Sequence, residues 1–326
     1  FRTRYYTHKT GALLDLIPYG DLWGGTGNSI KTQWPFLEKE PFSRDLDGRW
    51  RAVNTGRFYV LFYTGPAFPR WQAWGAQRFD GNSMEFAGFN GMGYGGWQAY
   101  ANKSGGLSAV WFPGFGPLIL ANNHNVMYSN TVWGENLNPS PEISAKNVNV
   151  CITADAYCDA AGSFDAAGGV FKRSGMIPDT PLHFERKITV SKDELSVEIT
   201  LKSKEAFRMR SLYEAIPFFA DLCELSVDGK KIVLPKVVST PSHAVTAATE
   251  GLSADSPLFR GSKITLTSFS GVKAEIALDS PGEFVMAVPL RYRDITASMS
   301  GFNVKLPSVW TKGMVYRIVY TICIIS

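Results

Sequence analysis

Histidine is scarce in this chain, and two of its four histidines stand where they could transfer a proton. His124 lies four residues after the apolar run at 118–120, which predicts a strand that leaves a sheet into a polar loop. Side chains at strand ends project from a rigid base, so His124 is a candidate acid or base and Tyr128 its candidate partner. The asparagines beside it could hold a carboxylate or fix the imidazole tautomer. An Asn-rich turn with an incidental histidine is the alternative interpretation.

A second group of such residues stands at the start of the sequence, where His8 follows Tyr6 and two arginines. In proton abstraction next to a carboxylate, an arginine neutralises the acid group while a tyrosine or histidine takes or returns the proton. This group therefore predicts the same chemistry, and a frayed basic N-terminus is the alternative. His183 opens a regular strand and His243 lies in a Ser/Thr/Ala-rich loop, so both are interpreted as surface or structural residues.

The stretch 57–120 combines tryptophan, tyrosine and phenylalanine with arginine in extended segments punctuated by glycine. Flat aromatic faces stack on sugar rings, and guanidinium groups clamp carboxylates or sulfates. The stretch therefore predicts a surface for an acidic polysaccharide; a sandwich core that uses many aromatic residues is the alternative. The candidate substrate-binding residues are Arg70, Trp71, Trp74, Arg78 and Trp97.

Other chemistries have less support in the sequence. The GxGxxG match at 91–96 is not followed by a helical pattern, which argues against a dinucleotide site. No HExxH, calcium loop or CxxC pair is present, and neither a metal nor a cofactor is expected. No GxSxG elbow is present, which argues against Ser-His-Asp hydrolysis. Asp80, Glu85, Glu135 and Glu214 sit in plausible places for glycoside hydrolysis, but the sequence does not single out a catalytic pair.

Composition and charge restrict the partners. The net charge is +4 and the basic residues are scattered, which favours an anionic partner but not nucleic acid. No apolar run is long enough to span a bilayer, so no membrane partner is expected. Cys151 and Cys158 flank a short polar stretch that could close as a hairpin and carry a disulfide; otherwise they are small apolar residues. The chain begins without Met, and we expect a mature or excised part of a longer secreted or periplasmic protein.

Alternating apolar and polar residues recur along the chain, whereas helical periodicity is rare. Three hairpins are predicted, with turns at Lys192-Asp193, Asp228-Gly229 and Ser270-Gly271. The predicted fold is therefore all-β with few helices, built as a large antiparallel sandwich of stacked sheets. Residues 1–220 are predicted to form a large antiparallel sandwich with aromatic-rich strands. Residues 221–326 have shorter, less aromatic segments and are predicted to form a smaller sheet region packed on it.

Several of these segments together resemble the β-sandwich half of heparinase-type polysaccharide lyases, in which a helical toroid precedes a large stacked sheet. The resemblance rests on RFYVLFYTGPAFPRWQAWGAQRF, GGLSAVWFPGFGPLIL, HFERKITVSKDELSVEITL and the opening YYTHKTGALLDLIPYG. It implies β-elimination in a uronic-acid-containing glycan, with His8 or His124 as the histidine of the sheet domain. The chain departs from the family because it has no helical toroid, so the resemblance implies a second chain or a missing N-terminal part that carries one. A non-catalytic glycan-binding or scaffolding sandwich is the main alternative, and a sugar epimerase or hydrolase is a weaker one.

Overall fold

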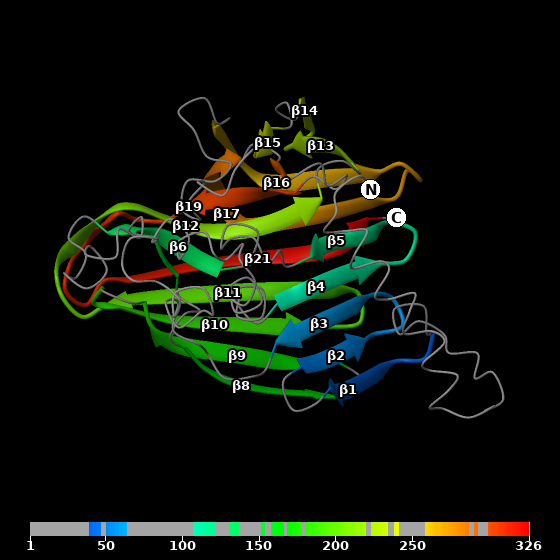
Figure 1. Cartoon of the computed structure of the whole chain (residues 1–326), viewed down its shortest axis with the longest axis horizontal. Helices are drawn as coiled ribbons and strands as arrows, with labels where there is room; N and C mark the ends of the chain where they lie inside the picture. The colour runs from blue at the N-terminus through cyan, green and yellow to red at the C-terminus, as the bar shows by residue number, and fades with distance from the viewer. Residues whose placement is uncertain are drawn as a thin grey trace.

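The computed structural model places most of the described residues in β-strands (Figure 1). The described residues are 39–46, 50–63, 107–120, 131–136, 151–153, 158–165, 168–177, 180–219, 223–233, 238–240, 258–286, 290–292 and 299–325. Within these ranges every regular element is a strand and none is a helix. The prediction of an all-β, antiparallel fold is confirmed.

A five-stranded antiparallel sheet forms the N-terminal part of the described chain, with its strands in sequence order. Its strands are β1 (Phe42–Leu46), β2 (Trp50–Asn54), β3 (Tyr59–Tyr63), β4 (Leu107–Phe112) and β5 (Gly116–Leu120). Consecutive strands pair side by side, so the sheet is a simple meander.

A second sheet contains sixteen described strands, and its main path has the order β7-β6-β12-β19-β17-β21-β11-β10-β9-β8. The strands up to β12 are β6 (Thr131–Asn136), β7 (Cys151–Thr153), β8 (Cys158–Asp165), β9 (Gly168–Met176), β10 (Leu182–Val190), β11 (Glu194–Ser203) and β12 (Phe207–Phe219). The later strands are β13 (Cys223–Val227), β14 (Lys230–Ile232), β15 (Val238–Thr240), β16 (Leu258–Ser268), β17 (Lys273–Met286), β18 (Leu290–Tyr292), β19 (Met299–Lys305), β20 (Val309–Trp310) and β21 (Val315–Ile325). We call it the large sheet.

All three predicted hairpins are confirmed. Strands β10 and β11 pair from Val190↔Leu195 outward, and alternate side chains of both strands are buried. The turn between β13 and β14 has positive φ at both Asp228 (46°) and Gly229 (78°), as a two-residue type I′ turn requires. The turn between β16 and β17 has its positive φ at Gly271 (81°).

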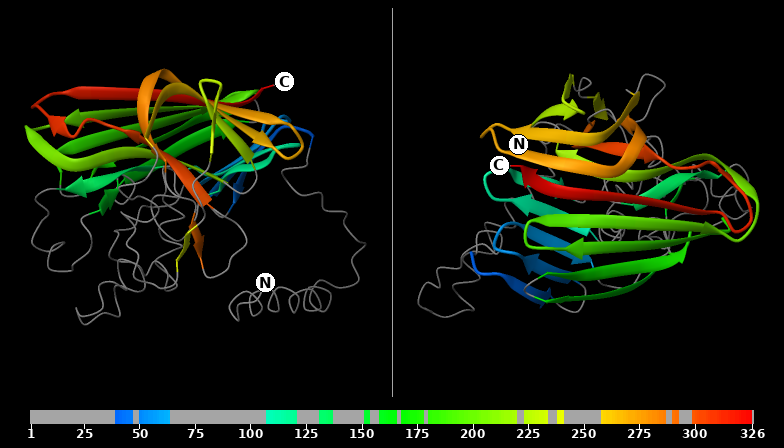
Figure 2. Two further views of the ribbon diagram at one scale, coloured as in Figure 1. Left: turned by 90° about the horizontal axis from the view of Figure 1, so that it is seen from above. Right: turned by 180° about the vertical axis from the view of Figure 1, so that it is seen from behind.

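The five-stranded sheet packs face to face on the large sheet, which makes the molecule a sandwich (Figure 2). Phe62 on β3 stacks on Phe171 on β9, with 5.2 Å between the ring centroids. One hydrophobic cluster contains buried residues of both sheets, and β5 lies against β12. Burial of these inward rows is the main stabilising term of such a sandwich.

Strands from both sides of residue 220 belong to the large sheet, where β19, β17 and β21 lie between β12 and β11. The predicted division of the chain at residue 220 stays a prediction about folding units. Strand β7 pairs with β6 and β8 with β9, so the described pairing contains no hairpin between Cys151 and Cys158. None of the described residues belongs to a helix that could cross a membrane.

Candidate functional site

The catalytic and substrate-binding candidates that the sequence selected all lie outside the described residues. These residues are Tyr6, His8, Arg70, Trp71, Trp74, Arg78, Trp97, His124 and Tyr128. The structure does locate the strand ends from which most of them continue, and it describes the inner face of the sandwich between the two sheets.

Three strand ends come together at one end of the five-stranded sheet. Strand β3 ends at Tyr63, β4 begins at Leu107 and β5 ends at Leu120. The register places them side by side, because Phe62 pairs with Leu107 and Leu120 pairs with Ala109. These ends point to the left in Figure 1.

Two of the three sequence-predicted segments are attached at this end. Residues 64–106, which contain the five substrate-binding candidates, connect β3 to β4. Residues 121–130, which contain His124 and Tyr128, connect β5 of the five-stranded sheet to β6 of the large sheet. The strand ends at Tyr63, Leu107 and Leu120, to which both segments connect, therefore lie at the same end of the sandwich.

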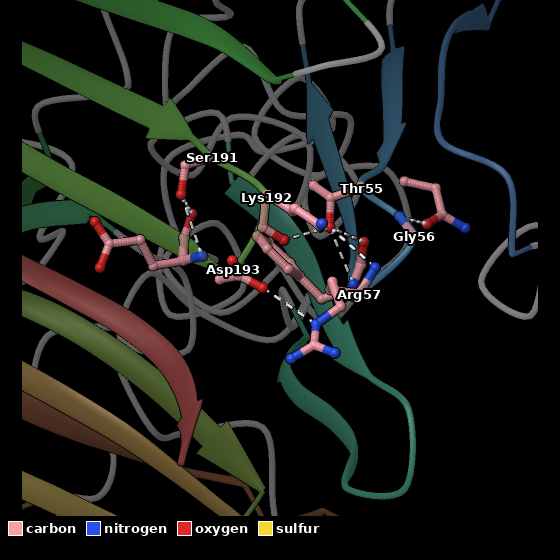
Figure 3. A network of polar contacts seen from close by, with 9 residues as sticks. Thr55, Gly56, Arg57, Ser191, Lys192 and Asp193 are labelled. Carbon is pink, nitrogen blue, oxygen red and sulfur yellow. Dashed lines mark hydrogen bonds and ion pairs between the residues drawn. The ribbon is translucent and has the colours of Figure 1, made fainter. Parts of the chain in front are cut away.

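The opposite end of the sandwich is closed by polar contacts between turns (Figure 3). The Thr55 hydroxyl, between β2 and β3, donates a 3.0 Å hydrogen bond to the carbonyl oxygen of Lys192, between β10 and β11. The same hydroxyl accepts hydrogen bonds from the backbone N–H groups of Arg57 and Phe58. Beside it, the Arg57 Nε donates to the Asp193 carboxylate at 3.1 Å. One turn of each sheet is thus held against a turn of the other.

A second contact joins the two sheets at this end. The Ser270 hydroxyl, in the β16–β17 turn, donates a 2.6 Å hydrogen bond to the carbonyl oxygen of Gly114, in the β4–β5 turn. Gly114 has φ +78°, and a Cβ there would lie 3.3 Å from the Val272 side chain. A residue with a side chain would be strained at this position, so glycine suits both the turn and the close approach of the sheets.

The inner face of the large sheet contains a fully buried charged cluster. Arg186 on β10 donates two parallel 2.8 Å hydrogen bonds, one to each oxygen of the Glu214 carboxylate on β12. The Tyr320 hydroxyl on β21 donates a third, also 2.8 Å, to Glu214 Oε1. All three side chains have no solvent exposure. A paired, bidentate geometry of this kind is what allows charges to be buried.

The cluster connects strands that are not neighbours. Strands β12 and β21 are separated by β19 and β17 in the sheet order, and β10 and β21 are separated by β11. The three side chains therefore meet across the inner face. Glu214 pairs with Val132 on β6, the strand that residues 121–130 enter. The cluster thus fixes the part of the large sheet that receives this segment.

A second arginine stands beside the cluster. Arg173 on β9 is the cross-strand partner of Arg186, and its side chain is 1% exposed. Its guanidinium carbon lies 5.8 Å from the centroid of the Phe171 ring, at the outer limit of a cation–π contact. The described inner face therefore places two guanidinium groups in directly opposed positions.

The structure adds to the sequence analysis at three residues. Glu214 was one of the four carboxylates considered for glycoside hydrolysis, from which the sequence did not single out a pair. Its oxygens accept hydrogen bonds from Arg186 and Tyr320 inside the core, away from solvent. Arg186 and Tyr320 were missed. The available signal was the alternation itself, since Arg186 occupies an inward position between Phe184 and Ile188. A charged residue in an apolar row predicts a buried partner.

In the described part of the stretch 57–120, several aromatic residues are buried in the core rather than displayed outward. These residues are Phe58, Phe62, Phe112 and Phe115. The alternative of an aromatic-rich sandwich core therefore holds for these four residues, because the inward rows of β3 and β4 face the large sheet, whereas Tyr59 and Trp111 are only half-buried. The outward display of the substrate-binding candidates stays a prediction.

Cys323 on β21 is half-buried, and its sulfur is not bonded to another cysteine. Burial raises the pKa of its thiol, and the carboxylates of Glu275 and Glu194, its cross-strand neighbours, raise it further. The thiol is therefore held in its protonated, weakly nucleophilic form at neutral pH. Across the described residues, no group of His, Cys, Asp and Glu side chains is arranged to hold a metal ion.

Comparisons with known proteins add likenesses of structure. No family model matches this chain, and no curated protein matches its sequence. The chain is similar to a 4-alpha-glucanotransferase from Thermococcus litoralis, with a TM-score of 0.48, 9% identity, and coverage of 89% of this chain and 40% of that one. It is similar to a galactose mutarotase-like protein from Clostridium acetobutylicum, with a TM-score of 0.46, 8% identity, and coverage of 87% and 98%.

A heparan sulfate lyase from Pedobacter heparinus is also similar, with a TM-score of 0.43, 8% identity, and coverage of 98% of this chain and 41% of that one. The chain spans about two fifths of the length of this lyase and of the glucanotransferase. All three TM-scores are below 0.5, and the likenesses transfer no activity, substrate or site residue to this chain.

Proposed function

We propose that this chain is the sandwich portion of a polysaccharide lyase that cleaves a uronic-acid-containing glycan by β-elimination. The supporting observation is the meeting of strand ends at Tyr63, Leu107 and Leu120. Two separate segments rich in proton-transfer, aromatic and cationic residues leave the sandwich at this end, while polar contacts close the other end. Chemistry-bearing loops on one end of a rigid scaffold are a common arrangement for an active site.

The proposed reaction needs three functions. A base removes the proton at C5 of the uronic acid, a positive or amide group neutralises the adjacent carboxylate, and an acid reprotonates the leaving oxygen. His124 or His8 acts as the acid/base or the neutralising group, and Tyr128 or Tyr6 is the proton-transfer partner. The C–O bond breaks as a C=C bond forms, so the products are an unsaturated sugar and a new chain end.

The substrate surface in this proposal is formed by the arginine and tryptophan residues of segment 64–106. Their guanidinium groups hold carboxylates or sulfates, and their indole rings stack on the sugars. These residues are Arg70, Trp71, Trp74, Arg78 and Trp97. A helical domain, supplied by a second chain or by a missing N-terminal part, completes the site, and the protein acts outside the cytoplasm or in the periplasm.

The test replaces His8 and His124 by Ala in the full natural protein and follows the ultraviolet absorbance of unsaturated products released from acidic glycans. His183→Ala is the matched control, because His183 is described on β10, outside the proposed site. We expect activity to fall at least about 100-fold in the double variant, the typical contribution of a general acid or base, and to persist in the control. Unchanged product release from the double variant would remove these two roles.

A non-catalytic glycan-binding or scaffolding module is the second candidate. The observation that favours it is the lack of any helix among the described residues, since the lyases that this sequence resembles carry a helical toroid. Isothermal titration with acidic and neutral oligosaccharides, run beside the absorbance assay, separates the candidates. Binding without turnover selects the module, and turnover selects the lyase.

A further inference from the structure

The outer face of the large sheet has an unusual pair of lysines. Lys172 on β9 and Lys187 on β10 are direct cross-strand partners, so their side chains project on the same face. Their neighbours Phe171, Arg186 and Ile188 are buried on the inner face, which places the two lysines outward. Seen from behind, β8 to β11 and β21 form a face that no other described strand covers (Figure 2).

Like charges directly opposite each other destabilise an antiparallel pair. Neither Lys172 nor Lys187 forms an ion pair with any residue that the structure describes. On the next strand, the cross-strand partner of Lys187 is Glu198, and its carboxylate is hydrogen-bonded at 2.7 Å to Arg317 on β21. The one acidic neighbour in this row is thus already engaged by another cation.

The outward positions of β9, β10, β11 and β21 hold one more cation than carboxylates. Lys202 and Arg317 are exposed outward in the adjoining rows, and the outward carboxylates of these strands are Glu185, Glu194 and Glu198. We call the four cations Lys172, Lys187, Lys202 and Arg317 the outer basic surface. Their spacing follows the sheet, with about 4.8 Å between strands and about 6.7 Å between alternate residues.

We propose that the outer basic surface binds an acidic polysaccharide along the strands β9, β10, β11 and β21. The cations fit repeating carboxylates or sulfates. Half-buried hydroxyl groups fit the sugar hydroxyls: those of Ser174 and Thr200 lie between the cations, and that of Thr189 lies in the next row. The outward positions of these four strands carry no Phe, Tyr or Trp among the described residues, so the face lacks the stacking platforms that single-stranded nucleic acids use.

This surface is distinct from the site of the proposed function. It lies on the outer face, whereas Arg173 and Arg186 project inward from the same two strands. It acts as a second contact for a long polymer, and it requires no turnover at the end where β3, β4 and β5 meet. Binding here therefore stands or falls separately from lyase activity.

The experiment measures binding of heparin, polygalacturonate, neutral dextran and duplex DNA by isothermal titration at low salt, with thermal unfolding in parallel. The variants are Lys172→Gln/Lys187→Gln, Glu198→Gln and the control Lys230→Gln, an exposed lysine on β14 at the far side of the sheet. Lys172→Gln/Lys187→Gln should weaken binding of the acidic glycans by about fivefold for each lysine removed, while Glu198→Gln should strengthen it. Lys230→Gln and dextran should show no effect.

Thermal unfolding tests the same proposal independently of the binding titrations. Without glycan, Lys172→Gln/Lys187→Gln should raise Tm by about 1 °C, because it removes the opposed charges. With heparin, the same variant should gain less in Tm than the wild type. The proposal would be overturned if the double variant bound glycan as tightly as the wild type, or if Lys230→Gln lost as much affinity as the double variant. It would also be overturned if DNA bound as tightly as heparin and its binding were equally sensitive to the two lysines.

Discussion

Strands β9 and β10 carry two opposed pairs of like charge in consecutive rows, one on each face of the large sheet. Arg173 and Arg186 face each other inside the core, and Lys172 and Lys187 face each other outside. Arg186 of the inner pair is compensated, since Glu214 and Tyr320 reach it from other strands. In the outer pair, neither lysine forms an ion pair with a described residue. The same strand register therefore places a buried, ion-paired arginine on one face and two lysines without an ion pair among the described residues on the other.

The difference follows from the cost of desolvation. A buried guanidinium must be paired and hydrogen-bonded, and the planar fork of arginine matches both oxygens of one carboxylate. An exposed ammonium stays hydrated, so it needs no partner and remains available to a mobile anion. The inner face thus uses charge to fix the strands, and the outer face keeps charge available for binding. The four predictions below test this contrast, from the largest expected effect to the smallest.

Glu214→Gln should have the largest effect. It leaves the Arg186 guanidinium in the core without its counter-charge, and breaking a fully buried pair costs about 3–5 kcal/mol. Urea unfolding measures the change in the free energy of unfolding. Glu185→Gln, the exposed carboxylate next to Arg186 in sequence, is the control and should change stability by less than about 0.5 kcal/mol. Similar losses in both variants would contradict the contrast between the faces.

Tyr320→Phe removes one hydrogen bond from the same carboxylate and leaves the ion pair in place. A hydrogen bond to a charged group contributes about 1.5–3 kcal/mol, so urea unfolding should show a loss in this range. Tyr316→Phe is the control, because Tyr316 on the same strand is only half-buried and belongs to no such network among the described residues. A loss in Tyr316→Phe as large as in Tyr320→Phe would show that the buried network is not the cause.

The local parts of this fold were predictable from the sequence. The hairpin turns at Lys192-Asp193, Asp228-Gly229 and Ser270-Gly271 are confirmed, because alternation and turn residues act over a few neighbouring positions. The strand order was not predictable. It brings β21 beside β11 and β12 beside β19, pairs whose partners are far apart in the sequence, and a period-two pattern does not specify a partner.

The candidate site was predictable only in part, for the same reason. The sequence selected the segments that contain His124 and the tryptophans, and strand pairing brings the ends of these segments together. The buried contact between Arg186 and Glu214 depends on side chains meeting across several strands. Alternation predicted that Arg186 points inward, but only the sheet order shows which carboxylate it meets.

Thr55→Val tests a buried contact at the closed end of the sandwich. Valine keeps the shape but removes the hydroxyl that bonds the Lys192 carbonyl and accepts two backbone N–H groups, so unfolding should become easier by about 1–2 kcal/mol. Thr200→Val, on the outer face of β11, is the control and should change stability by less than about 0.5 kcal/mol. An unchanged free energy of unfolding in Thr55→Val would show that the turns are held together by the apolar core alone.

Glu198→Gln should have the smallest effect, and its sign depends on pH. The hydrogen bond from Arg317 lowers the pKa of the Glu198 carboxyl in the folded protein, and the charge of Lys187 lowers it further. A carboxyl whose folded pKa is lowered contributes stability that is fully present above the ordinary glutamate pKa of about 4.3 and is lost as the pH falls through the folded value.

The wild type should therefore exceed Glu198→Gln in stability by about 0.2–1 kcal/mol near neutral pH, the usual range for an exposed pair, and the difference should shrink as the pH falls below about 4. Urea unfolding across this pH range, at low and high salt, measures it. Arg317→Gln should flatten the same pH dependence, because it removes the donor. A difference that grows on acidification would contradict the lowered pKa of Glu198. A difference that salt does not reduce would mean that this outer ion pair behaves like the buried one, and the contrast between the two faces would fail.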